Sequence, residues 1–282
     1  MEKDTHTHTH THTRQEVSQL VSESTKADGK FIDYARTFDS DNALQVFYEK
    51  YGYVTIKKII PSDLISEIQN ELINIFSPFA TDKTNPVDSA IIQLDKSDKP
   101  KLYELHTAAS KVISFRAVSV HLSKILKRIS GSEAPVLEIE AGFLLSIPKD
   151  KRLVYDFHQE SNYMKGFEDI FNIHYPLFRT STPENGTMSI LPSSQNYGTL
   201  TFDKKNVSQD SYTNLIPSGI DAITSKLPEL HCQLELGDCV IFHKDLIHKS
   251  NFNSSNLCRP VGVSRFTQSL VGDWVKRKPE EL

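Results

Sequence analysis

Two separated segments of the chain contain residues whose types and spacing suit metal chemistry. The first is FHQES at 157–161, where His158 and Glu160 are two residues apart. On a β-strand, residues i and i+2 point to the same face, so this imidazole and this carboxylate would project together. An HxE pair occurs by chance in many proteins, and the pair therefore gains meaning only from a partner elsewhere in the chain.

The second segment, 234–266, supplies a distant imidazole. Its pattern predicts a strand, a turn at Gly237 and Asp238, a second strand, and a segment that opens with His248, with Arg259 eleven residues later. Two histidines and a carboxylate make the facial triad of non-haem Fe(II) oxygenases, which leaves three octahedral positions open. A bidentate 2-oxo acid can take two of them and dioxygen the third. The far carboxylate of that co-substrate needs a planar, permanently charged partner, which arginine supplies.

Four motifs in the same order resemble the phytanoyl-CoA dioxygenase (PhyH) family of Fe(II)/2-oxoglutarate oxygenases. They are FYEKYGYVTIKKIIPSDLISEI at 47–68, HQESNYM at 158–164, ENGTMSILPSSQNYG at 184–198 and GDCVIFHKDLIHKSNFNSSNLCR at 237–259. The long last block is the most diagnostic, and the resemblance spans about residues 43–268. It implies Fe(II), 2-oxoglutarate and O2 as cofactors and co-substrates. The resemblance also implies roles for six residues. The implied iron ligands at the catalytic centre are His158, Glu160 and His248. The residues implied to bind 2-oxoglutarate are Arg259, Ser250 and Tyr175.

Two positions depart from the family pattern. The family usually has aspartate where this chain has Glu160, and the extra methylene adds one rotatable torsion. Either the backbone lies farther from the metal or the carboxylate folds back, and glutamate is still a competent oxygen ligand. The sequence PSSQ at 192–195 replaces the family's PGSH, which we expect to change the shape of a turn rather than the chemistry.

The elements that must position these residues fall into two halves. Helices are predicted at 43–52, at 62–76 with Ser62 as N-cap, and over 101–131; a strand is predicted at 53–59 and a loop over about 77–100. From Val136 onward, short segments rich in β-branched and aromatic residues predict strands, namely 136–147, 169–178, 187–192, 197–202, 232–243 and 259–271. The fold class is therefore α+β: an antiparallel sandwich or jelly roll with N-terminal helices packed outside. The family resemblance narrows this to a double-stranded β-helix, a cupin-like jelly roll.

Composition and charge indicate which partners and which cellular location to expect. The 282 residues carry 32 basic and 36 acidic side chains, a formal charge of −4, which argues against nucleic acid as a partner. No stretch approaches the roughly 18 apolar residues of a membrane span, and the N-terminus lacks the apolar run of a signal peptide. Three cysteines without a CxxC spacing suggest reduced thiols and a cytoplasmic location. The sequence indicates no particular oligomeric state.

The N-terminal region differs from the rest. Residues 5–13 read THTHTHTHT, and residues 14–38 are also polar. We expect residues 1–38 to be a disordered low-complexity tail and residues 39–282 to form a single oxygenase domain.

Other residues near the motifs have plainer interpretations. We expect His243 to be a packed strand residue and Arg265 to form a structural ion pair, and His174 is equally compatible with pointing into or out of the barrel. The substrate walls are expected from residues 161–171, 77–100 and 200–230.

The expected function is hydroxylation of a small molecule with release of succinate and CO2. Desaturation, epimerisation or halogenation on the same scaffold stays open. So does a non-catalytic jelly-roll binding protein with a vestigial metal site.

Overall fold

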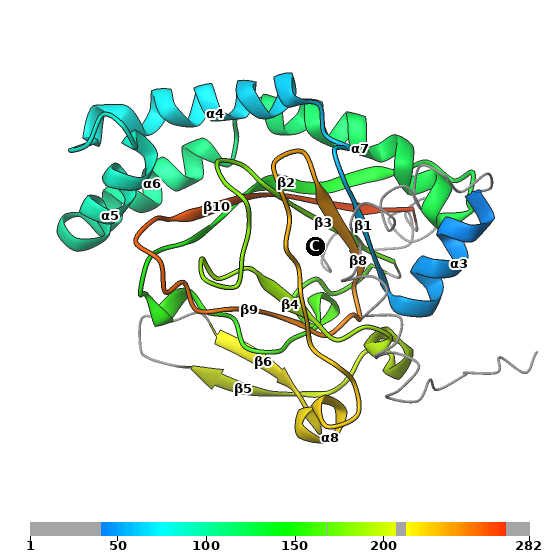
Figure 1. The fold of residues 1–282 in the computed structure, drawn as a ribbon. Coiled ribbons are helices and arrows are strands. Elements are labelled where there is room, and N and C mark those ends of the chain that lie inside the picture. The colour runs from blue at the N-terminus through cyan, green and yellow to red at the C-terminus, as the bar shows by residue number, and fades with distance from the viewer. Residues whose placement is uncertain (1–40, 168, 207–212, 269–282) are drawn as a thin grey trace, which may run out of the picture.

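Two antiparallel sheets form the core of the computed structural model, which describes residues 41–167, 169–206 and 213–268 (Figure 1). The larger sheet has the order β1 (Tyr53–Ile56), β8 (Cys239–His243), β3 (Phe171–Pro176), β10 (Arg259–Thr267), β2 (Leu137–Ser146). The smaller sheet has the order β7 (Leu230–His231), β4 (Met188–Ile190), β9 (His248–Ser250). Side chains from both sheets line one shared pocket. The predicted jelly-roll core is therefore confirmed.

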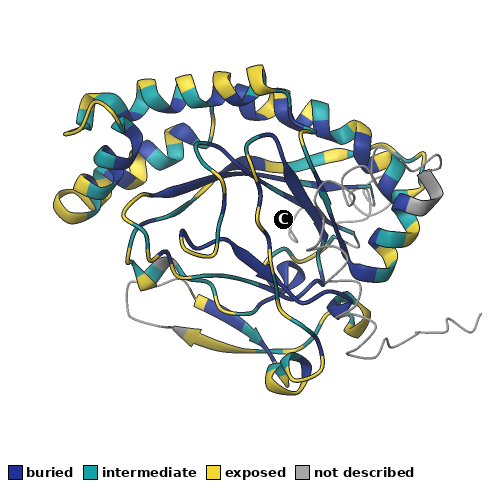
Figure 2. Ribbon diagram, viewed as in Figure 1, coloured by how far each residue is buried: buried dark blue, intermediate teal, exposed yellow. Residues whose placement is uncertain are grey.

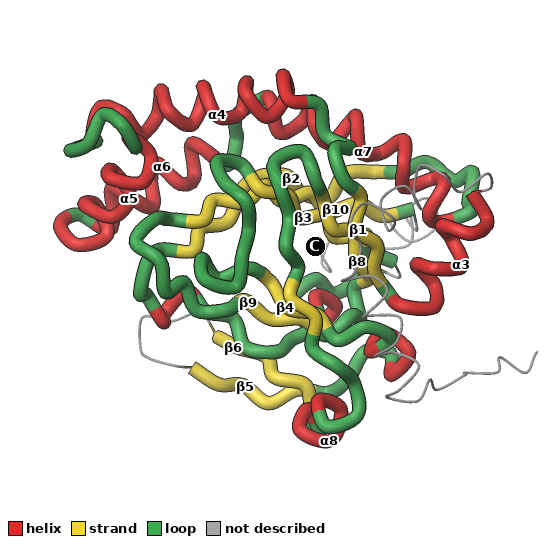
Figure 3. The backbone as a smooth tube through the Cα atoms, viewed as in Figure 1, coloured by secondary structure: helices red, strands yellow, loops and turns green. Residues whose placement is uncertain are grey.

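Helices cover the outer face of the larger sheet (Figure 3). They are α3 (Asp41–Tyr51), α4 (Ser62–Phe76), α5 (Pro86–Ser97), α6 (Lys99–Ala109) and α7 (Ser114–Ser130). The longest, α7, buries Val118, Leu122 and Leu126 and ends at Gly131, whose φ of 61° is the left-handed conformation that glycine adopts most readily. Stacking of Phe115 on Phe143 joins α7 to β2. Along these helices, buried residues alternate with exposed ones, as expected where one side of a helix packs on the sheet (Figure 2).

The predicted loop over 77–100 is wrong, because α5 and the start of α6 occupy much of it. Pro86 and Pro100 lie in the first turns of these helices, where a missing N–H costs nothing. Ser62 is the first residue of α4 rather than its cap, and Pro61 holds the cap position without a side-chain hydrogen bond. The hairpin of β5 (Phe202–Asn206) and β6 (Thr213–Pro217) and the short α8 (Ile220–Thr224) were not predicted.

Two predictions concern residues at the ends of the chain. The expected disordered tail at 1–38 lies outside the described residues. The single domain over 39–282 stays a prediction. Within the described ranges, none of the helices is both long and apolar enough to span a bilayer.

Candidate metal centre

His158 and His248 are brought together by their own backbones. They form an isolated antiparallel bridge, in which each N–H donates to the other's carbonyl at 2.9 and 3.1 Å, and their ring centroids are 4.1 Å apart. Glu160 opens a 3₁₀ turn at Glu160–Asn162 rather than continuing a strand. The side chains of His158 and Glu160, two residues apart, thus reach one site. The backbone between them is a bridge followed by a turn, not a regular strand.

Both imidazoles are oriented for metal binding by backbone carbonyls. Nδ1 of His158 lies 2.7 Å from the carbonyl oxygen of Asp156, and Nδ1 of His248 lies 2.9 Å from that of Leu246. A carbonyl only accepts hydrogen bonds, so each Nδ1 carries the proton and each Nε2 keeps its lone pair. Fixing the tautomer through the other ring nitrogen is the usual arrangement of histidine metal ligands. The two rings therefore fit a metal ion bound at Nε2.

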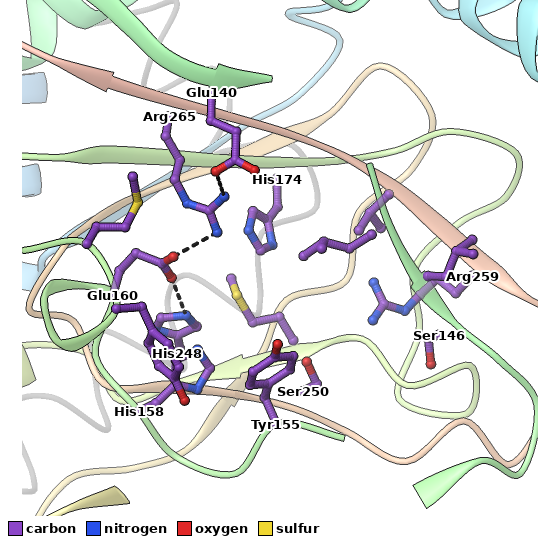
Figure 4. A pocket seen from close by; sticks show the side chains of 16 residues that line it. Glu140, Ser146, Tyr155, His158, Glu160, His174, His248, Ser250, Arg259 and Arg265 are labelled. Carbon is purple, nitrogen blue, oxygen red and sulfur yellow. Dashed lines mark hydrogen bonds and ion pairs between the residues drawn. The ribbon is translucent and has the colours of Figure 1, made fainter. Parts of the chain in front are cut away.

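The Glu160 carboxylate completes a cluster of metal-binding size. Its Oε2 is 3.7 Å from Nε2 of His248, and one ligand atom from each of the three residues lies within 4.8 Å of the others. All three side chains are buried, and Figure 4 shows them together in the pocket. The second oxygen, Oε1, pairs with Nη2 of Arg265 at 2.7 Å. The site thus offers two nitrogens and one carboxylate oxygen to a common point.

Burial and neighbouring charges set the protonation of these ligands. Burial lowers the pKa of His158, and burial together with the nearby His158 holds the pKa of His248 well below its usual value. Burial alone would raise the pKa of Glu160, but Arg265 and His158 outweigh it, and the net pKa is lowered. Neutral imidazoles beside an ionised carboxylate are the forms that bind a divalent cation.

Arg259 lies across the same pocket from Glu160 (Figure 4). Its Nε donates to the carbonyl of Asn185 at 3.1 Å and its Nη2 to that of Gly186 at 2.6 Å. Among the described residues, no carboxylate pairs with it, and burial lowers the pKa of Arg259 to about 10. Ser250, on β9, also lines this pocket, whose volume is about 260 Å³. A buried guanidinium without an acidic neighbour is a site for an anion.

Five of the six predicted site residues line this pocket: His158, Glu160, His248, Ser250 and Arg259. Tyr175 does not, and its prediction is corrected. Side chains alternate along β3, so His174 points into the pocket and Tyr175 points to the helical side. There Tyr175 packs across Gly262, where a Cβ atom would come within 2.1 Å of its ring.

Two further residues complete the pocket: Arg265, whose expected ion pair is confirmed, and His174, which the sequence left undecided between the inside and the outside of the pocket. Arg265 and His174 both line it, and burial holds the pKa of His174 well below its usual value. The three pocket histidines are thus His158, His174 and His248. Alternation along β10 contained a signal for Arg265, since residues 259, 261 and 265 line one face. The expected walls at 77–100 and 200–230 contribute no side chain among the described residues, whereas Tyr163 and Met164 from 161–171 do.

The fold and the cluster define a jelly-roll protein with a two-histidine, one-carboxylate metal site. The family model for phytanoyl-CoA dioxygenase (PhyH) matches residues 48–261, and the chain belongs to this family. A probable phytanoyl-CoA dioxygenase of Caenorhabditis elegans is 22% identical over 270 residues, covering 86% of this chain and 85% of that protein.

Solved structures share the fold at low identity. EctD from S. alaskensis with bound Fe superposes with a TM-score of 0.55 at 17% identity, covering 82% of this chain and 78% of that one. The epimerase SnoN in complex with Fe3+, alpha ketoglutarate and nogalamycin RO gives 0.52 at 16% identity, covering 81% and 83%. The predicted cofactors, iron and 2-oxoglutarate, agree with the ligands of these structures and with the donor set of this chain.

Proposed function

We propose that this protein is an Fe(II)- and 2-oxoglutarate-dependent dioxygenase that hydroxylates a small-molecule substrate and releases succinate and CO2. One observation supports this most directly. A single pocket holds the His158, Glu160 and His248 cluster and, across from it, the buried Arg259 without an acidic partner among the described residues. A metal at the cluster and a dicarboxylate reaching from it toward Arg259 would satisfy both ends of the pocket.

Different residues of the pocket would bind the metal and the co-substrate. His158, Glu160 and His248 would hold Fe(II), which supplies dioxygen activation coupled to decarboxylation of 2-oxoglutarate when bound. Arg259 offers a charged fork to the far carboxylate of the co-substrate. Ser250 can donate one further hydrogen bond to the same group. Because Arg259 is already fixed by the carbonyls of Asn185 and Gly186, little rotamer freedom is lost when the anion binds.

The remaining walls define the substrate side of the pocket. Leu144, Tyr163 and Met164 line it, and the hydroxyl of Tyr163 is engaged by the backbone of β6, where it donates to the carbonyl of Thr213 at 3.0 Å. Substrate atoms placed there would meet these side chains and the polar groups of Glu140, His174 and Arg265. This mixture of charged and apolar side chains along one small pocket favours a small organic substrate, with no role for nucleic acid or a membrane.

Glu160 favours hydroxylation over halogenation. A carboxylate at this position occupies the coordination site that a small residue would leave open to chloride. We therefore expect no chlorinated product, even at high chloride concentration.

The test of the proposal is product analysis with labelled oxygen. The protein is loaded with Fe(II) and 2-oxoglutarate under ¹⁸O2 and incubated with fractionated small-molecule extracts. The proposal expects a substrate whose product gains one labelled oxygen atom in step with succinate. Loss of two hydrogens would indicate desaturation, and an isomer of unchanged mass would indicate epimerisation. A protein that binds metal but forms no succinate would be a binding module. A cytoplasmic location is part of the proposal and is checked by fractionation.

A further inference from the structure

The ion pair between Glu160 and Arg265 extends to a third charged residue. Nη2 of Arg265 lies 2.7 Å from Oε1 of Glu160, and its Nη1 lies 2.7 Å from Oε2 of Glu140 on β2. The Arg265 side chain is 12% exposed, that of Glu160 9% and that of Glu140 55%. One guanidinium thus bridges a buried carboxylate at the cluster and a carboxylate at the solvent edge (Figure 4).

A β-bulge in β2 orients Glu140 toward Arg265. Arg265 on β10 stands opposite Glu140 on β2, but the next residue, Phe266, stands opposite Glu138, so Ile139 is an extra residue in β2. Glu138 and Glu140 would share a face in a regular strand. With the bulge, Glu138 pairs with Arg116 of α7 on the helical side, while Glu140 faces the pocket. The bulge therefore turns one glutamate toward Arg265.

We propose that Arg265, held by Glu140, is a positioning residue that fixes the Glu160 carboxylate for metal binding. This inference rests on the proposed function. Glutamate has one more side-chain torsion than the family's aspartate. Orienting its carboxylate toward a metal therefore requires that this extra torsion be fixed. Arg265 holds Oε1, which leaves Oε2 on the side of His248, 3.7 Å from its Nε2. The arginine compensates for the longer arm of the ligand.

Glu140 resolves an electrostatic conflict in this arrangement. A lone arginine beside the cluster would repel a divalent cation. Its pairing with Glu140 at 2.7 Å makes the two side chains together neutral. The Arg265–Glu140 pair can therefore orient Glu160 without placing net positive charge beside the metal. Partners that orient ligating groups in this way typically contribute 10- to 100-fold to metal affinity.

The experiment removes the pair without changing net charge. Binding of Co²⁺ alone to the full chain is titrated calorimetrically for wild type and for the double variant Glu140→Gln with Arg265→Gln, each with Glu160 present or changed to alanine. We expect the double variant to lose about 10- to 100-fold in Co²⁺ affinity when Glu160 is present, and less than about twofold in the Glu160→Ala background. The visible spectrum of bound Co²⁺ should change with it, because coordination by Glu160 is loosened.

The outcomes separate this inference from the function on which it rests. An equal loss in both backgrounds, or no loss with Glu160 present, overturns the positioning role and leaves the metal site intact. Unchanged Co²⁺ affinity in Glu160→Ala alone would overturn the ligand assignment as well. If the double variant does not fold, Arg265→Lys serves instead: it keeps the buried charge, loses the planar fork, and should lose about 3- to 10-fold, again only with Glu160 present. Arg116→Gln, which breaks the pair on the other face of β2, is the matched control and should change nothing.

Discussion

Replacing Arg259 with alanine should weaken 2-oxoglutarate strongly while leaving the fold intact. In the free protein the guanidinium is buried without an acidic partner among the described residues, and its pKa is lowered to about 10. Burial therefore disfavours the charged form of this guanidinium in the free protein. Removing the charge recovers part of that cost, which offsets the loss of the hydrogen bonds to Asn185 and Gly186. We therefore expect a change in unfolding free energy within about 1 kcal/mol.

The effect on co-substrate binding is much larger. Truncating one partner of a buried charged pair costs about 2–5 kcal/mol. At about 1.4 kcal/mol per factor of ten, the dissociation constant of 2-oxoglutarate should rise by roughly 30-fold to several thousand-fold. Arg259→Lys keeps the charge but not the planar fork and should fall between wild type and alanine.

Calorimetric titration of 2-oxoglutarate into protein loaded with Co²⁺ measures this directly. Arg116→Ala, which removes an arginine from the helical side of β2, is the matched control and should bind 2-oxoglutarate as wild type does. An Arg259→Ala protein that binds 2-oxoglutarate within threefold of wild type would show that the anchor of the far carboxylate lies elsewhere.

Three further predictions concern the ligand, the pocket histidines and the packing behind the pocket. Glu160→Ala should lose most of its iron and all succinate release, whereas Glu160→Asp should keep measurable turnover; full iron content and turnover in the alanine variant would contradict the assignment. Because burial lowers the pKa of the three pocket histidines, the unfolded chain binds more protons below about pH 6.5. The metal-free protein should therefore keep its full free energy of unfolding above that pH. Below it, this free energy should fall by up to about 1.4 kcal/mol per histidine per pH unit, and less steeply in His174→Asn. Equal denaturation midpoints at pH 7.5 and 5.5 would argue against this. Gly262→Ala should destabilise the fold by about 3 kcal/mol or more, since its Cβ would lie 2.1 Å from the Tyr175 ring. Tyr175→Phe should leave the affinity for 2-oxoglutarate unchanged. A wild-type melting temperature in Gly262→Ala, or weakened binding in Tyr175→Phe, would count against the placement of Tyr175.

The cluster could be predicted from the sequence because its residues lie in motifs with fixed spacing. His158 and Glu160 are neighbours along the chain, and His248 and Arg259 lie in one long block with Ser250 between them. Tyr175 was misplaced because only an aromatic type was matched, whereas the face of a strand depends on parity. A shift of one residue moves a side chain to the opposite face of the sheet.

Other features depend on contacts that no local pattern contains. The helix α5 was missed because its proline and polar residues also suit a loop, although Val87, Ala90, Ile91 and Leu94 are buried against the other helices. The direction of Glu140 depends on the bulge at Ile139, which is visible only in the register between β2 and β10. The pairing of the strands therefore decided that Arg265 and His174, both considered from the sequence, face the pocket.

Succinate formation from 2-oxoglutarate tests most directly whether the cluster and Arg259 form an oxygenase site. Purified protein is incubated aerobically with 2-oxoglutarate, with and without added Fe(II), beside His248→Ala and Arg259→Ala. We predict succinate that depends on iron in the wild type, none above background in His248→Ala, and recovery of turnover in Arg259→Ala only at much higher 2-oxoglutarate concentration. Iron-independent succinate, or equal rates in wild type and His248→Ala, would contradict this prediction.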